Sequence, residues 1–388
     1  MKIALIGQKG IPTQQGGIEK HVEELSTRLA KAGLDVTVYS RPYYTGNREK
    51  KYFYNGVRMI NLPSLKTKNF DAITHTFISS IHAIFQNYDI IHYHGVGPSL
   101  LSWIPRVFAP KSKVIVTFHC ADRQHQKWGL FARLMLTAGE WTSCKFPHET
   151  ITVSQTLKKY CWHYFRRATN YIPNGVQTVK VPESGILAKY GLKKDNYFVL
   201  ISRLIQHKGV HTLIKAYKQI ETSKKLVIVG DGSNTDGYVR HLKEISRDND
   251  NIIFTGKQTG QDLNTLFTNA FMFVQPSEAE GLSIALLEAM SYGIPVLISD
   301  IEENQEVTDG YGLEFKNKNS ADLARQLNFA IKHPRMIKER ALEAKKQIDQ
   351  KYNWQDITKQ TINLYKKTLS SKPAKNLNKN VRLVTSNQ

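Results

Sequence analysis

Apolar residues come in short continuous runs along the chain, with stretches of helical periodicity between them. The first run, Lys2–Gly7, is followed by apolar residues at helical spacing across Gly17–Gly33. Further runs occupy Val36–Tyr39, Val57–Leu62, Ile90–Tyr93, Val114–Phe118, Thr150–Val153, Tyr197–Ile201, Lys225–Val229, Ile252–Phe254, Phe271–Gln275 and Pro295–Ile298. Such runs are typical of parallel strands covered by helices on both faces. The pattern therefore predicts an α/β fold with two doubly wound, Rossmann-like domains.

The join between the two domains is predicted near residues 177–194, where Pro182, Gly185 and Gly191 interrupt the periodicity. We expect a first domain over residues 1–178 and a second over residues 179–365. Residues 366–388 carry six Lys and Arg and no acidic residue, and most of them lack periodicity. This end of the chain is predicted to be a loosely ordered basic tail.

Positive charge is concentrated in the first half of the chain. Residues 1–180 hold 24 basic and 10 acidic side chains, whereas residues 181–365 hold 24 and 23. This asymmetry predicts an anionic partner for the first domain, such as a membrane surface, a phosphorylated lipid or a nucleic acid. A basic surface that serves only solubility is the alternative.

Cysteine usage and hydropathy bear on the compartment. The three cysteines, Cys120, Cys144 and Cys161, have no C-x-x-C spacing and predict neither a disulfide framework nor a zinc site. No stretch reaches the roughly 18 apolar residues that span a bilayer, and the first apolar run is too short for a signal peptide. We therefore expect a cytoplasmic protein.

Two turns that follow predicted strands carry groups suited to phosphate. Gly16 and Gly17 precede a predicted helix, where adjacent glycines let a phosphate approach free backbone N–H groups, although a simple loop is the alternative. Arg203 and Lys208 follow the strand Tyr197–Ile201, at the rim where open α/β sheets bind ligands. These two cations suit a diphosphate, although solvated surface charge would give the same pattern.

The most informative segment runs from Gln275 to Pro295. Glu280 and Glu288 lie eight positions apart, so a helix beginning near Gly281 would place them on one edge, about 12 Å apart. That separation is too large for an acid/base pair on one bond but suits opposite ends of an elongated ligand. The N–H groups of Gly281, Leu282 and Ser283 would then face a phosphate.

The whole pattern resembles the retaining glycosyltransferases of family 4, which have the two-domain GT-B fold. Pro276-Ser-x-x-Glu280-Gly281 and the following Glu-Ala-Met-x-x-Gly-x-Pro-Val resemble the family's donor-site motif. Most of the chain agrees, because further motifs occur in the family's order: Gly16-Gly17-Ile-Glu19-Lys-His-Val, Ile90-Ile-His-Tyr-His94-Gly, Thr117-Phe-His119, Ile151-Thr-Val-Ser154, Ile172-Pro-Asn174-Gly-Val176 and Arg203-x(4)-Lys208-Gly.

The resemblance implies roles for the matching residues. Arg203 and Lys208 would bind the diphosphate of a nucleotide-sugar, Glu288 the ribose, and Glu280 with the Gly281–Ser283 amides the transferred sugar and phosphates. Gly16 and Gly17 would close over the donor, and His119 would lie beside the reacting carbon. The resemblance further implies a same-face substitution without a covalent nucleophile.

No metal or other cofactor is expected for transfer. Charge develops on the leaving diphosphate, and Arg203, Lys208 and backbone amides can stabilise it. Asp248-Asn-Asp250 spells the D-x-D metal motif of another glycosyltransferase fold, but it precedes the strand Ile252–Phe254 and is interpreted as a polar turn. The histidines have no metal-ligand spacing with nearby carboxylates, and His92 is interpreted as a core residue.

The acceptor is predicted on the first domain. Candidate acceptor-side residues are His94, Arg123, Lys127 and Trp128. The stretch from Arg123 to Leu136 mixes cations with large apolar residues, which suits an anionic membrane surface, although an amphipathic helix packed on the sheet is the alternative.

The sequence thus predicts a peripheral enzyme at the inner membrane face that extends a cell-envelope glycan, with a lipid-linked acceptor. The resemblance contributes the lipid-linked acceptor, because the family commonly glycosylates such molecules. One alternative is the same chemistry on a soluble sugar or α-glucan. Another is a non-catalytic polyanion-binding protein, against which stands the absence of a recognisable nucleic-acid module.

Overall fold

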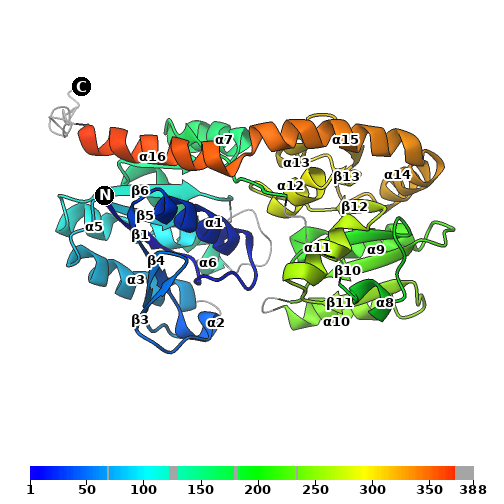
Figure 1. Cartoon of the computed structure of the whole chain (residues 1–388), viewed down its shortest axis with the longest axis horizontal. Helices are drawn as coiled ribbons and strands as arrows, with labels where there is room; N and C mark the ends of the chain where they lie inside the picture. Colours follow the sequence, from blue (N-terminus) through cyan, green and yellow to red (C-terminus); the bar gives the residue numbers. More distant parts are fainter. Residues whose placement is uncertain (68–69, 122–129, 179–181, 183, 233–234, 372–388) are drawn as a thin grey trace, which may run out of the picture.

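The computed structural model describes residues 1–67, 70–121, 130–178, 182, 184–232 and 235–371. The described chain forms two α/β domains that lie side by side, each built on its own sheet (Figure 1). The predicted fold class, two doubly wound parallel-sheet domains, is confirmed.

The first sheet has eight strands in the order β3-β4-β2-β1-β5-β6-β7-β8, and all neighbours except β3 and β4 are parallel. Its strands are β1 (Lys2–Ile6), β2 (Asp35–Ser40), β3 (Lys51–Tyr54), β4 (Val57–Asn61), β5 (Ile90–His94), β6 (Lys113–Phe118), β7 (Glu149–Thr152) and β8 (Asn170–Tyr171). The six predicted strands are all present. The two that the pattern missed, β3 and β8, are the strands at the two edges of this sheet.

Helices cover this first sheet, and the fully buried side chains of β1, β2 and β5 form its core. The helices are α1 (Gly17–Lys31), α2 (Pro42–Thr45), α3 (Asp71–Ile84), α4 (Val96–Ser99), α5 (Trp103–Phe108), α6 (Leu130–Lys145) and α7 (Gln155–Phe165). In α1, Val22, Leu25 and Leu29 are buried, as the helical spacing predicts.

The second sheet has six parallel strands in the order β11-β10-β9-β12-β13-β14. They are β9 (Tyr197–Ile201), β10 (Lys225–Val229), β11 (Ile252–Gly256), β12 (Met272–Gln275), β13 (Val296–Ser299) and β14 (Leu313–Phe315). The associated helices are α8 (Ile186–Lys189), η2 (Gln206–Lys208), α9 (Val210–Tyr217), α10 (Asp236–Ile245), α11 (Gly260–Thr268), α12 (Ile284–Ser291), α13 (Glu302–Thr308), α14 (Ser320–Lys332) and α15 (Pro334–Lys351).

The last helix, α16 (Trp354–Ser370), returns to the first domain, and this changes the expected boundaries. Figure 1 shows α15 over the second domain and α16, in orange and red, continuing over the first. α16 packs on α1, and the Tyr365 hydroxyl lies 2.7 Å from His92 Nδ1 on β5. Residues 354–365, which the sequence pattern assigned to the second domain, therefore complete the core of the first. The helix also includes residues 366–370, the start of the predicted tail, whereas residues 372–388 lie outside the described residues.

The chain crosses between the domains twice at one place. On the outward crossing, Val176 N donates to Tyr352 O at 2.8 Å. The outgoing segment at Val176 therefore pairs with the segment that returns to the first domain. A Cβ on Gly175 would lie 2.5 Å from the Trp354 indole, so a side chain there would displace the ring. The two crossings therefore form one compact connection.

Within the described residues, every helix is too short or too polar to traverse a bilayer.

Candidate active site between the domains

On the second domain, Lys208 and Glu280 meet at the rim of the sheet. Gly209 turns with φ +66°, and a Cβ there would overlap the Pro276 carbonyl, so the turn after Lys208 packs closely on the loop before Glu280. Lys208 Nζ lies 2.5 Å from Glu280 Oε1, and these side chains are 16% and 9% exposed. The expected donor-site cation and carboxylate therefore neutralise each other in a largely desolvated position.

A buried polar network holds the loop that carries Glu280. Ser283 Oγ donates to Gln275 Oε1 at 2.7 Å, and the amide of Gln275 donates to Asn304 Oδ1 at 2.6 Å. Asn304 donates in turn to Ser299 Oγ, whose hydroxyl donates to the Ser277 carbonyl. Because these groups are buried and bonded, the loop has one preferred geometry.

The helix after this loop begins later than the sequence suggested. α12 starts at Ile284, and Ser283 is its N-cap, with the hydroxyl accepting from Leu286 N at 3.3 Å. Glu280 therefore lies in the preceding loop rather than on one helix edge with Glu288, and the amides of Gly281 and Leu282 precede the helix. The motif fits a capped start at Ser283 because Ser is a preferred N-cap residue.

The first domain closes against α12 through the glycine pair. Gly16 is the N-cap of α1 with φ +105°, and a Cβ on Gly17 would contact Ile284 Cδ1 at 3.7 Å. One turn into α1, Lys20 forms an ion pair with Glu288 across the domain boundary. Burial alone would lower the pKa of Lys20, but the Glu288 carboxylate raises it above its ordinary value. Lys20 is thus held as a cation on the carboxylate expected to bind ribose.

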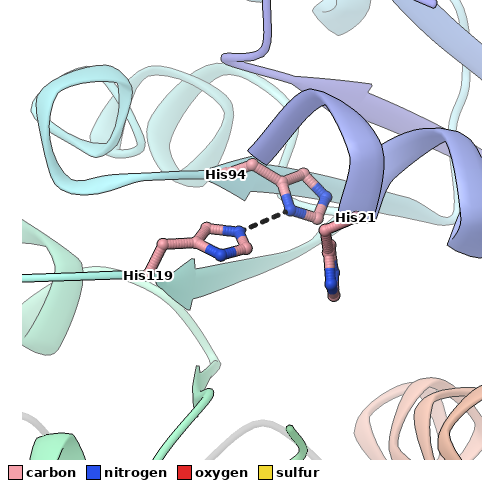
Figure 2. A group of neighbouring side chains, drawn as sticks. All are labelled: His21, His94 and His119. Atoms are coloured by element: carbon pink, nitrogen blue, oxygen red, sulfur yellow. Dashed lines mark hydrogen bonds between the residues drawn. The ribbon is translucent and has the colours of Figure 1, made fainter. Parts of the chain in front are cut away.

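His119, after β6, lies where the two domains touch. The His119 carbonyl packs on Gly281, where a Cβ would lie only 1.7 Å from it, so glycine is required at position 281. The side chain is buried beside His94, and His94 Nδ1 lies 3.3 Å from His119 Nε2 (Figure 2). Burial holds the pKa of both imidazoles well below the ordinary value, so both are neutral.

A third imidazole, His21 of α1, completes a cluster with His94 and His119. Its ring centroid lies 4.9 Å from that of His119, and each of the three side chains offers one ligand nitrogen within 4.8 Å of the others (Figure 2). Linear spacing does not reveal this cluster, because its three histidines come from separate segments of the chain. The fourth nearby histidine, His92, is buried as predicted and lies 2.7 Å from both the Tyr365 hydroxyl and Thr117 Oγ1.

The remaining described candidates, Arg203 and His94, differ in exposure. Arg203 is exposed at the sheet rim. Burial lowers the pKa of Lys9 on the first domain, and the charges of Arg41 and Arg203 also lower it. His94 is fully buried. The other acceptor-side candidates, Arg123, Lys127 and Trp128, lie outside the described residues.

Asp248 of the D-x-D sequence lies in a turn and pairs with Lys218 at 2.7 Å. The interpretation of this segment as a polar turn agrees with the structure.

Two residues of this site, Lys20 and His21, were not predicted from the sequence. Both belong to the quoted motif Gly16-Gly17-Ile-Glu19-Lys-His-Val, and they lie at the end of the first turn and the start of the second turn of a helix whose N-terminus faces α12. Their position directly after the glycine pair was the available signal.

Two family models cover most of the chain. Residues 15–180 match the model described as Glycosyltransferase Family 4, and residues 185–354 match the model described as Glycosyl transferases group 1. The chain belongs to glycosyltransferase family 4. This family membership supports an enzyme rather than the non-catalytic polyanion-binding alternative.

Relatives extend over both domains. An uncharacterised glycosyltransferase of Methanocaldococcus jannaschii is 25% identical, with 94% of this chain and 98% of that protein covered. The O-antigen chain mannosyltransferase C of Escherichia coli is 26% identical over 78% of this chain and 80% of its own length.

Solved structures share the fold. Sucrose-phosphate synthase from Thermosynechococcus elongatus superposes with a TM-score of 0.79 at 22% identity, over 94% of this chain and 98% of its own. Anabaena HepE in complex with UDP and glucose superposes with a TM-score of 0.78 at 19% identity, over 95% of this chain and 100% of its own. The GT-B fold of this family 4 member is thereby confirmed.

Proposed function

We propose that this glycosyltransferase moves a sugar from a nucleotide-diphosphate donor to a lipid-linked cell-envelope glycan, with retention of configuration, at the cytoplasmic face of the membrane. The observation that carries the donor part is the pair of charge contacts at the domain boundary, Lys208–Glu280 and Lys20–Glu288. Relatives support the acceptor class, among them the O-antigen chain mannosyltransferases of Escherichia coli and a phosphatidyl-myo-inositol mannosyltransferase of Mycobacterium leprae.

Donor binding would exchange these ion pairs for ligand contacts. The diphosphate binds the Lys208 ammonium and the exposed Arg203 guanidinium, so Glu280 becomes free to accept hydrogen bonds from sugar hydroxyls. The ribose hydroxyls donate hydrogen bonds to Glu288 and replace Lys20 as its partner. Since the unliganded carboxylates and cations are already paired, the site holds little uncompensated charge before the donor arrives.

Transfer would break the bond between the sugar and the diphosphate. The negative charge that develops on the leaving phosphate is stabilised by Lys208, Arg203 and the loop amides before α12, without a required metal or other cofactor. Neutral His119 lies beside the reacting carbon and offers a hydrogen bond to the sugar or the incoming hydroxyl. The acceptor hydroxyl bonds to the anomeric carbon on the face that the diphosphate leaves and gives its proton to the departing phosphate, which retains the anomeric configuration.

An exposed apolar surface on the first domain supports membrane association. Phe77, Ile81 and Phe85 follow one another at four-residue spacing along and just beyond α3, and are 50%, 37% and 73% exposed. α5 packs beside α3 and exposes Trp103, Val107 and Phe108. We call these six residues the α3–α5 apolar surface. Arg106 and Lys111 beside it are exposed cations suited to anionic headgroups.

A thermal-shift screen tests the donor assignment. The protein is heated with UDP, GDP, dTDP, ADP and their sugars, with and without magnesium, because a ligand at 100 times its dissociation constant adds about 2.7 kcal/mol of stability. We expect one nucleotide class to stabilise the protein without magnesium. The Glu288→Ala variant should lose this stabilisation, whereas Glu302→Ala, an exposed glutamate on α13, should keep it. Stabilisation retained by Glu288→Ala would contradict the assignment.

Flotation with vesicles containing anionic lipid tests the acceptor location. We expect the wild type to float with anionic vesicles, and the double variant Phe77→Ser and Phe85→Ser to remain at the bottom of the gradient. Trp162→Ser on α7, which is 55% exposed but outside the α3–α5 apolar surface, is the matched control. A wild type that never floats would favour a soluble acceptor, for which the 24% identical glycogen synthase of Mycobacterium tuberculosis is a precedent.

A further inference from the structure

Three buried imidazoles converge although they come from three separate elements. His21 lies on α1, His94 at the end of β5 and His119 just after β6. They are 4%, 0% and 6% exposed, and their candidate ligand nitrogens lie within 4.8 Å of one another (Figure 2). Among the described residues, His21 Nδ1 has no hydrogen-bond partner, whereas His94 Nδ1 and His119 Nε2 lie 3.3 Å from each other. A buried polar nitrogen without a partner is unusual and calls for a ligand.

The distances suit a shared cation. Two nitrogens bound 2.0–2.1 Å from a tetrahedral zinc ion lie about 3.4 Å apart. The His94 Nδ1 to His119 Nε2 distance of 3.3 Å is already at that separation. The His21 ring must approach by roughly 1–1.5 Å to reach the same spacing.

The ligand chemistry narrows the class of metal. Imidazole nitrogen is a common ligand of divalent transition metals. The cluster has no carboxylate, which disfavours magnesium, calcium and manganese and favours zinc, copper or nickel.

We propose that His21, His94 and His119 bind one divalent transition-metal ion of the imidazole-preferring class, with Zn²⁺ as the principal candidate. The ion is not required for transfer. It binds the His119 imidazole, which the proposed function places beside the sugar, so a bound ion inhibits transfer. This second statement rests on the proposed function, whereas the binding itself does not.

Metal titration of chelator-treated protein tests the site. Zn²⁺ binding is followed by calorimetry, and Co²⁺ binding by the visible absorption of tetrahedral cobalt. We expect one tight site per chain and at least a tenfold weaker affinity in His21→Asn and in His94→Asn. His333→Asn, an exposed histidine of the second domain, should bind as the wild type does. Circular dichroism checks that each variant folds. If His94→Asn does not fold, the metal affinity of His21→Asn, on the surface-facing helix, is the test.

Binding that is absent, or equal in wild type and His21→Asn, would overturn the metal site. The inhibition is tested separately with the nucleotide-sugar that the thermal-shift screen identifies. Zn²⁺ should raise the apparent KM for the donor in the wild type but not in His21→Asn, and chelator should reverse the effect. Tight binding without inhibition would support the metal site but refute the proposed position of the sugar beside His119. Since binding is measured without any substrate, failure of the proposed function leaves that result intact.

Discussion

At the scale of single residues, the Lys208–Glu280 pair is the most directly testable feature. We expect Lys208→Ala and Glu280→Gln each to lower transfer about 10²–10³-fold, because each removes a group that faces developing charge or the sugar. The fold should persist in both variants. Lys218→Ala, which breaks the more exposed pair with Asp248, is the control and should transfer at the wild-type rate. Initial rates with saturating acceptor provide the measurement, and a wild-type rate in Lys208→Ala would refute its role.

His75 of α3 gives a prediction on pH. Burial, assisted by the nearby Arg41 guanidinium, lowers its pKa to about 4, although the Asp71 carboxylate opposes this shift. The unfolded chain binds a proton near pH 6.5, whereas the folded chain binds it only near pH 4. The free energy of unfolding should therefore fall as the pH decreases from 6.5 to 4.

His75→Gln removes this titration and should make the decrease shallower. Urea unfolding of wild type and variant at a series of pH values gives the slopes. Equal slopes over that interval would show that His75 titrates alike in the folded and unfolded chains.

At the scale of elements, the N-terminus of α7 is completed by a residue of the other domain. Ser154 Oγ accepts from Leu157 N, while the Glu306 carboxylate on α13 accepts from Gln155 N at 2.7 Å and from Thr156 N at 3.0 Å. A carboxylate at a helix N-terminus also interacts favourably with the helix dipole. The contact therefore joins capping of α7 to docking of the two domains.

Glu306→Gln keeps the shape of this contact but removes the charge, and Glu306→Ala removes both. We expect Glu306→Ala to lower the free energy of unfolding by about 1–2 kcal/mol and Glu306→Gln by less. Glu302→Ala, an exposed residue of the same helix, is the control. Thermal unfolding provides the comparison, and losses of equal size for Glu306→Ala and Glu302→Ala would argue against the cap.

The predictability of the elements follows from their burial. Strands such as β1 and β9, buried on both faces, gave continuous apolar runs and were predicted within one or two residues. β3 alternates exposed and half-buried residues at an edge, and β8 and β14 have two and three residues, so no apolar run marks them. Periodicity alone also could not show that α16 packs on the first domain, because a stripe of apolar residues does not show which surface it packs against.

For the site, sequence motifs identified Glu280, Glu288, Lys208 and His119, which the fold brings to the domain boundary. The Lys20–Glu288 contact across that boundary was not predictable, because it depends on how the two domains face each other. The position of His21 was not predictable either, because it depends on how α1 packs within the first domain. Linear spacing contains no such information.

At the scale of the whole molecule, α16 is part of the first domain although it is the last described helix. Trp354 is 4% exposed and packs on Gly175 at the crossing, and Tyr365 is fully buried. We expect Trp354→Ala to lower the free energy of unfolding by about 3–5 kcal/mol through loss of burial and the resulting cavity. Trp162→Ala on α7 removes an indole that is 55% exposed and should cost much less. Urea unfolding followed by far-UV circular dichroism compares the two variants, and equal losses would contradict the assigned place of α16.

The return of α16 to the first domain also sets the order in which the protein can be completed during synthesis. The first sheet leaves the ribosome early, but the helix that covers His92 is made about 190 residues later. At about 5–20 residues per second this interval is on the order of ten to forty seconds. Throughout that time the nascent first domain exposes the apolar surface that Trp354 and Tyr365 later bury. Chaperones that recognise exposed apolar surface therefore have a defined interval in which to bind this chain.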